Sequence, residues 1–110
     1  MIKETITNIE NKIRQNTSIQ DKDKTQLLKL LAGLKTEVSE LSKTDNEHAE
    51  SITGFAQTST HEATRKEKNE QLLNLSLKGL TSSVEEIESS HPELVEIVNR
   101  ISHVLSNMGI

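Results

Sequence analysis

Histidines and glutamates are the residues of this chain whose types could do chemistry. His61 and Glu62 begin like the helix motif of zinc proteases, in which a second histidine follows four residues after the first. Arg65 stands at that position, so the motif is incomplete. A zinc site needs three or four converging ligands. The other histidines are not spaced as ligands of one ion: His48, His91 and His103. The sequence therefore predicts no metal site.

The sequence also contains no motif for nucleophilic or acid–base catalysis. Serines and threonines are plentiful, but none lies in a strand–turn–helix elbow, and no glycine-rich phosphate loop is present. Glu85, Glu86 and Glu88 form a cluster, yet a general acid needs a pocket that raises its pKa, and we expect these carboxylates on a helix surface. We therefore expect no catalytic residue, no cofactor and no enzymatic activity. An enzyme or a metal-binding protein would require distant polar groups to converge in the fold.

The composition predicts one small helical domain with a thin core. The chain has 110 residues, 32% of them hydrophobic, and Phe55 is its only aromatic residue among Phe, Trp and Tyr. Strands and ligand pockets usually draw on aromatic residues, so their scarcity argues against a sheet and a large apolar pocket. Cysteine is absent, which excludes disulfides and thiolate metal sites.

The charge pattern argues against nucleic acid as a ligand. Basic and acidic residues, 13 and 17 in number, are interspersed and give a net charge of -4. Duplexes are bound through basic stripes and single strands through aromatic stacking, and the chain offers neither. The N-terminal segment lacks a signal-peptide core, and no stretch has the apolar length of a membrane span. We expect a soluble, cytoplasmic protein.

Four segments carry apolar residues at alternating intervals of four and three, the pattern of a helix with one buried face. We place these helices at residues 2–15, 20–57, 66–89 and 92–108 of a single domain spanning 1–110.

Each of these helices has a seam of apolar positions that we expect in the core or at an interface. Leu72 and Leu75 lie beside the third seam. The four seams consist of Ile6, Ile9 and Ile13; Leu27, Leu31, Leu34, Val38 and Leu41; Leu73, Leu77, Leu80, Val84 and Ile87; and Leu94, Val98, Ile101, Leu105 and Met108.

Residues 43–71 carry a weaker signal. The second seam continues as Asp45, His48, Ile52 and Phe55, so half of the continuing positions are polar. Gly54 weakens a helix by about 1 kcal/mol relative to alanine. No proline interrupts the segment, and a structureless loop of this length is unusual in a small domain. The sequence predicts helical extensions of the flanking elements with a break near 58–70, the alternative being a flexible connector.

The start of the last helix is marked by a proline. Pro92 fits the first turn of a helix, where its missing amide hydrogen has no intrahelical partner, and it pushes His91 out of the α region. Either His91 or Ser90 is therefore the N-cap. If the cap is Ser90, Glu93 stands three residues on and can close a capping box.

Two further motifs mark the start of the second helix and the end of the last one. Ser18 with Asp21 is typical of a capping box at the start of the second helix. Gly109 fits the left-handed position after the last helix, and Ile110 could then fold back onto Leu105, as in a Schellman ending.

Short connections make neighbouring helices antiparallel, so the sequence predicts an all-α, antiparallel up-and-down bundle of two helical hairpins with long helices. The first seam, Ile2 to Ile13, is about half as long as the second and would leave the far end of that helix bare. We therefore expect a homo-oligomer, with a dimer favoured.

Two motifs resemble the C-terminal signature of a short bacterial family, domain of unknown function 4404. They are the run from Ser83 to Glu88 and the run from Ser90 to Leu94, followed by Leu105 through the terminal Gly109-Ile110. The N-terminal hairpin is similar in layout. The resemblance implies no activity, no catalytic residue and no cofactor.

These patterns together predict a non-enzymatic, self-associating protein that binds an unidentified protein partner. The alternative is an amphipathic protein that coats a hydrophobic granule or a membrane surface. Membrane-binding helices usually have a basic polar face and bulky aromatic residues, which this chain lacks.

Overall fold

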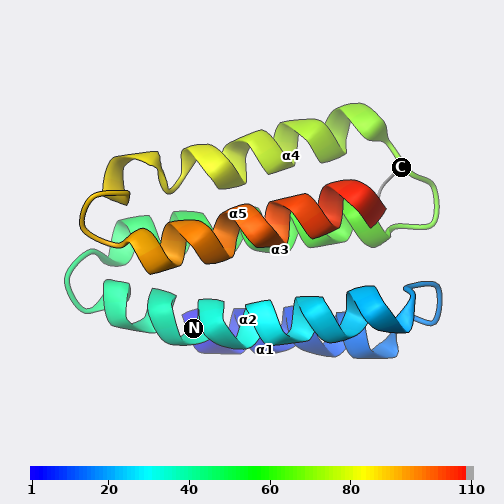
Figure 1. Cartoon of the computed structure of the whole chain (residues 1–110), viewed down its shortest axis with the longest axis horizontal. Coiled ribbons are helices and arrows are strands. Elements are labelled where there is room, and N and C mark those ends of the chain that lie inside the picture. The colour runs from blue at the N-terminus through cyan, green and yellow to red at the C-terminus, as the bar shows by residue number, and fades with distance from the viewer. Residues whose placement is uncertain (109–110) are drawn as a thin grey trace.

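The computed structural model describes residues 1–108, and this part of the chain is an all-α, up-and-down bundle, as predicted. Successive helices run in opposite directions along the long axis of the molecule (Figure 1). The elements are α1 (Ile2–Gln15), α2 (Asp21–Ser42), α3 (Asn46–Thr64), α4 (Glu70–Ser82), the short 3-10 helix η1 (Glu85–Ile87) and α5 (Pro92–Met108).

Helix α3 lies at the centre of the bundle because its inward side chains are small. It packs against each of the other four α-helices, and that face includes Ala49, Ala56 and Ala63. Two buried threonines on α3 donate to carbonyls of their own helix: Thr53 to Ala49 at 2.8 Å and Thr60 to Ala56 at 2.9 Å. Such back-bonding satisfies the hydroxyl without a partner from another helix, so a helix with few large apolar residues can be buried on several sides.

The predicted helix over 20–57 is wrong, because the chain breaks at residues 43–45. Helix α2 ends at Ser42 and α3 begins at Asn46. The side chain of Asp45 accepts a hydrogen bond from the His48 amide at 3.1 Å, which caps α3. A capping carboxylate satisfies one of the free amides of the first turn and favours a new helix start at this position.

The predicted break near 58–70 is confined to residues 65–69, since α3 continues to Thr64. Asn69 then caps α4 by accepting from the Leu72 amide at 3.0 Å. The predicted helix over 66–89 is also too long at its C-terminal end. Helix α4 ends at Ser82, and η1 occupies Glu85–Ile87.

The capping box predicted from Ser18 and Asp21 is wrong. Helix α2 begins at Asp21 after Gln20, which makes no side-chain capping bond. The amide of Ser18 donates instead to the side chain of Asn16 at 2.8 Å. This bond holds a tight turn of the Asx type between α1 and α2.

Helix α5 begins at Pro92, which places His91 rather than Ser90 directly before the helix. The amide of Ser90 donates to the Ile87 carbonyl at 3.2 Å, and its hydroxyl donates to the same carbonyl at 3.3 Å. In a capping box the Ser90 amide would donate to the side chain of Glu93, but here it donates to the Ile87 carbonyl. The predicted caps Gly109 and Ile110 lie outside the described residues.

The predicted seams form the hydrophobic core of the single chain. Every seam residue is buried except Leu77 and Met108, which are partly buried and pack against the core. The C-terminal end of α2, expected to be bare, is covered, since Val38 and Leu41 are 0% and 1% exposed. Helix α2 packs against α1, α3 and α5, so an uncovered seam is no longer a reason to expect an oligomer.

Gly54 is an exposed glycine in α3, and no atom lies within 4 Å of the place where a Cβ would stand. We expect Gly54→Ala to raise the free energy of unfolding by about 1 kcal/mol, because alanine loses less backbone entropy in a helix. Urea unfolding followed by circular dichroism measures this. Gly33→Ala is the matched control and should gain less, since its Cβ would lie 3.2 Å from Ile97 Cδ1. An unchanged midpoint for Gly54→Ala would contradict the expectation.

Candidate interaction surface

The residues whose types could do chemistry stay apart in the fold. His48 contacts Asp45, with Nδ1 and Oδ2 3.2 Å apart, and His91 contacts the hydroxyl of Ser90 at 2.9 Å. His61 is exposed on α3. No group of three or more His, Cys, Asp or Glu within residues 1–108 is placed to hold a metal ion. The glutamates of the acidic cluster are exposed at the surface: Glu85, Glu86 and Glu88.

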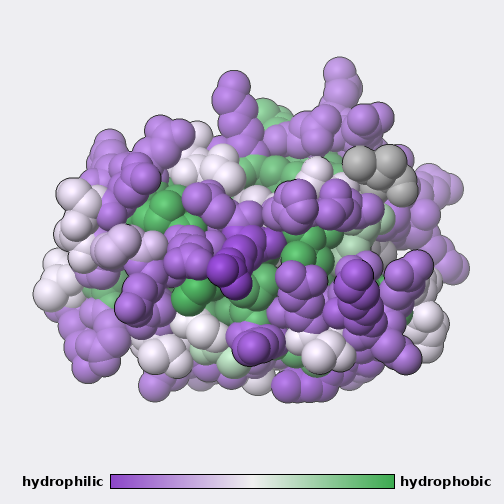
Figure 2. All heavy atoms as spheres, viewed as in Figure 1, coloured by the Kyte–Doolittle hydropathy of each residue, from purple (hydrophilic) through white to green (hydrophobic). Residues whose placement is uncertain are grey.

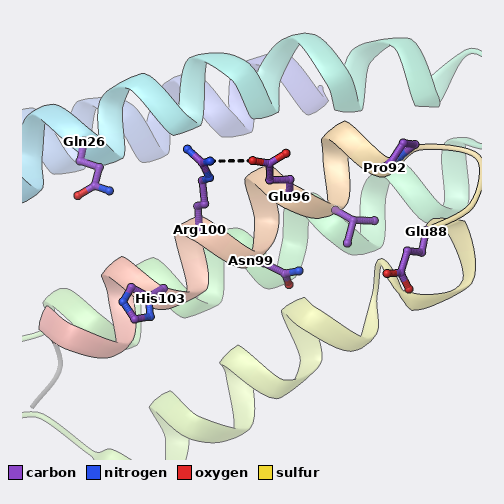
Figure 3. Close-up of a pocket in the computed structure, with 8 residues that line it drawn as sticks. Gln26, Glu88, Pro92, Glu96, Asn99, Arg100 and His103 are labelled. Carbon is purple, nitrogen blue, oxygen red and sulfur yellow. Dashed lines mark hydrogen bonds and ion pairs between the residues drawn. The ribbon is translucent and has the colours of Figure 1, made fainter.

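A shallow groove of about 440 Å³ runs along α5, next to α2 and η1 (Figure 3). Two of its charged groups form an exposed ion pair, with Arg100 Nη2 2.7 Å from Glu96 Oε1, and Glu88 lies apart from this pair. Asn99 and His103 lie along the same helix and are exposed. The groove thus presents solvated polar groups beside Val95, rather than a buried group prepared for catalysis.

Exposed apolar residues gather on α4 and the adjacent part of α3. Leu75 is 67% exposed, Leu72 is 41% exposed, and Phe55 on α3 is 39% exposed. Within residues 1–108 the only other large hydrophobic residue that is exposed is Met1. We call Phe55, Leu72 and Leu75 the α4 stripe. In Figure 2 the upper edge of the molecule, where Figure 1 places α4, is mostly hydrophilic, and hydrophobic residues show between the polar side chains.

Gly79 fixes the position of Phe55 in the stripe. Leu72, Leu75 and Gly79 follow one another at intervals of three and four, so they share one face of α4. A Cβ at Gly79 would collide with the ring of Phe55, so a residue without a side chain is what lets the ring lie against α4. The exposed ring borders a groove that is also lined by Ser82, Ser83 and Glu86.

The stripe is exposed because α4 is an outer helix. It packs mainly against α3 and α5, and its buried side chains are Leu73, Ser76 and Leu80. Leu72 and Leu75 lie beside the seam, as predicted, but outside the core. The signal in the sequence is an excess of leucines in α4, more than one helix face can bury. Which face is covered depends on the neighbouring helices.

No described helix is both long enough and apolar enough to cross a membrane. This finding covers residues 1–108.

Comparison with known proteins gives one match. Residues 27–110 match the family model described as Domain of unknown function (DUF4404). No curated protein and no solved structure matches the chain. The matched region begins inside α2 and includes α3, α4 and α5, so it contains the central helix and the α4 stripe. The match confirms the predicted family, and the chain belongs to it.

Proposed function

We propose that the chain is a non-enzymatic protein-interaction module that associates with a second copy of itself through the α4 stripe. The observation that supports this proposal is the exposure of Leu75, which is 67% accessible and lies one helical turn from Leu72, itself 41% exposed. Contiguous exposed apolar residues with a polar rim are typical of protein contact sites. Symmetric dimers are the commonest assemblies of soluble proteins, and a two-fold contact brings the same stripe from both copies together.

The size of the stripe indicates a weak and reversible dimer. Complete burial of one leucine side chain stabilises by about 1.5–3 kcal/mol, and each copy contributes Leu75 and Leu72, which are only 67% and 41% exposed. Association costs several kcal/mol in lost translational and rotational freedom, which offsets most of this gain. We therefore expect a dissociation constant on the order of 1 mM.

Coating of a membrane or granule surface fits this stripe less well. Helices that lie in a membrane interface usually combine a larger apolar face with a basic polar face. The polar residues around the stripe carry both signs, with Glu70 at the start of α4 and Lys78 three residues after Leu75. The stripe therefore has no basic polar face that would attract anionic lipids. We expect no co-sedimentation of the protein with anionic vesicles, and binding to them would favour the coating function instead.

The proposal is tested by replacing Leu75 with glutamate. We expect native protein to show a concentration-dependent rise in mass by light scattering between about 0.1 and 3 mM, a range that brackets the expected dissociation constant. Leu75→Glu should remain a monomer over this range, because a buried, unpaired carboxylate opposes association.

Asn8→Glu is the matched control for this test. Asn8 is exposed on α1, away from the stripe, so this variant adds the same charge without touching the proposed contact. It should associate like the native chain. A native chain that stays monomeric throughout the range would refute the proposed self-association.

A further inference from the structure

We infer that the groove lined by Phe55 and Glu86 binds an arginine side chain from a basic segment of another protein. The guanidinium stacks on the ring of Phe55 and pairs with the Glu86 carboxylate. This contact goes beyond the proposed self-association and does not depend on it.

The groove lies between the first half of α3 and the C-terminal end of α4, and its volume is about 300 Å³. This volume is at the lower limit for ligand clefts, about 300–1,000 Å³, so one long side chain fits it better than a larger ligand. The lining residues come from α3, from α4 and from the segment that follows α4: His48, Ser51 and Phe55; Gly79 and Ser82; and Ser83 and Glu86.

The ring of Phe55 supplies the aromatic wall of the groove. It is 39% exposed, and it lies against α4 because Gly79 has no side chain. The face of an aromatic ring attracts cations, and a planar guanidinium stacks on such a ring more readily than the ammonium group of lysine. An arginine on this ring also covers, with its methylene groups, apolar surface that is exposed in the single chain. The ring therefore favours arginine as the occupant.

Glu86 supplies a carboxylate to the same groove. It is exposed, and within residues 1–108 it forms no ion pair. His48 is the other titratable side chain of the lining. Its Nδ1 lies 3.2 Å from Asp45 Oδ2, so a protonated imidazole would have its charge balanced within the chain. A cation in the groove therefore meets a carboxylate that has no competing partner, and charge-assisted hydrogen bonds are roughly twice as strong as neutral ones.

The chain segments that form the groove contain acidic residues but neither lysine nor arginine. Residues 44–57 include three acidic residues, and residues 79–99 include five glutamates. The start of α3 and η1, which belong to these two segments, lie at the same end of the bundle (Figure 1). An acidic surface of this kind attracts a basic partner and repels an acidic one.

The two lysines nearest to these segments in the sequence do not fill the groove. Lys43 pairs with Glu40 at 3.2 Å. Lys78 does not line the groove, and it lies one position before Gly79, so it projects from a different face of α4.

A second copy of the chain is a poor source of the arginine. The chain has three arginines, and each is engaged within the chain, at 3.2, 3.0 and 2.7 Å respectively: Arg14 with Asn11, Arg65 with Glu62 and Arg100 with Glu96. Each would have to leave this contact before it could enter the groove of another copy. The arginine is therefore expected from a different protein.

An NMR titration tests the site. The probe is a peptide of repeated Gly-Ser-Arg, added up to about 2 mM to about 50 μM labelled protein, well below the dissociation constant expected for the dimer. We expect a dissociation constant for the peptide on the order of 0.1–1 mM. The amide signals of Gly79, Ser83 and Glu86 should shift, while that of Ser18, at the opposite end of the bundle, should not.

Two variants remove the two contacts separately. Glu86→Gln and Phe55→Leu should each raise the dissociation constant of the peptide about threefold or more at low salt. Glu93→Gln is the matched control, because Glu93 is exposed at the start of α5 and does not line the groove. It removes the same charge and should change the constant by less than about 1.5-fold. Circular dichroism verifies that each variant is folded.

A second peptide tests the chemistry of the occupant. Citrulline has nearly the shape of arginine but no charge, so the peptide with citrulline in place of arginine should bind about tenfold more weakly. Equal binding of the two peptides would overturn the inference. So would a loss with Glu93→Gln as large as that with Glu86→Gln, because the peptide would then recognise the acidic surface in general rather than the groove.

The outcomes for the groove and for the proposed function are separate. A chain that binds the arginine peptide in the groove but never dimerises supports the inference and refutes the proposed self-association. A chain that dimerises but shows no shifts at the groove with the arginine peptide refutes this inference alone.

Discussion

The Ala56→Leu variant will melt roughly 10–15 °C below the native chain. Ala56 is 0% exposed in the middle of α3, the helix that packs against all four other α-helices. A leucine there adds three carbon atoms in a place surrounded by packed side chains. Overpacking of this kind costs about 1–3 kcal/mol, and we expect the upper part of the range because Ala56 lies on the face of α3 that packs against the other helices.

Ala32→Leu is the matched control for this prediction. Ala32 is exposed on α2, so the same substitution there adds its carbons to solvent. Its effect on the free energy of unfolding should stay within about 0.5 kcal/mol. Thermal unfolding by circular dichroism or calorimetry compares the two variants. Equal melting temperatures would contradict the central position of α3.

The helices predicted with the correct bounds are α1 and α5, and each combines a strong seam with a clear end. In α5 the proline at position 92 sets the start, because it fixes its own backbone and restricts His91. In α1 three isoleucines at helical spacing stand among polar residues, so one face is plainly marked: Ile6, Ile9 and Ile13. The bounds of these two helices depend on residues close together in the sequence, which is why a sequence pattern predicts them well.

Helix α3 was not predicted as an element of its own, for two physical reasons. Its buried face is composed largely of alanine, serine and threonine, which patterns of large apolar residues do not detect. Threonine hydroxyls that donate to carbonyls of their own helix can be buried, as those of Thr53 and Thr60 are, but only the structure shows that these hydrogen bonds form. Asp45 is a residue type that favours an N-cap, but it also lies at a position that continues the second seam. The seam therefore indicated a continuous helix rather than a new helix start.

The α4 stripe was only partly predictable. The sequence places Leu72 and Leu75 beside the third seam, and Phe55 was expected to continue the second. Their exposure follows from α4 being an outer helix and from the contact of Phe55 with Gly79. Both depend on residues far apart in the chain, and no local pattern contains that information.

The Lys35→Met variant will lose about 2–3 kcal/mol in the free energy of unfolding, because it leaves a nearly buried carboxylate without its partner. Glu10 on α1 is 5% exposed, and its Oε1 lies 2.6 Å from Lys35 Nζ on α2. Removing one partner of a buried pair costs more than removing both, since the remaining charge keeps its desolvation penalty. We place the loss below the largest values known for such pairs because the Lys35 side chain is 30% exposed and water screens the contact.

The double variant Glu10→Leu/Lys35→Met should recover most of this loss, because no charge is then left in the contact between α1 and α2. Urea unfolding of the single and double variants measures the recovery. Lys43→Met is the matched control, since Lys43 pairs with Glu40 at 3.2 Å with both side chains exposed, and surface pairs contribute little. If Lys35→Met were as stable as Lys43→Met, the Glu10 carboxylate would have to be solvated, and the close packing of α1 against α2 would be wrong at this position.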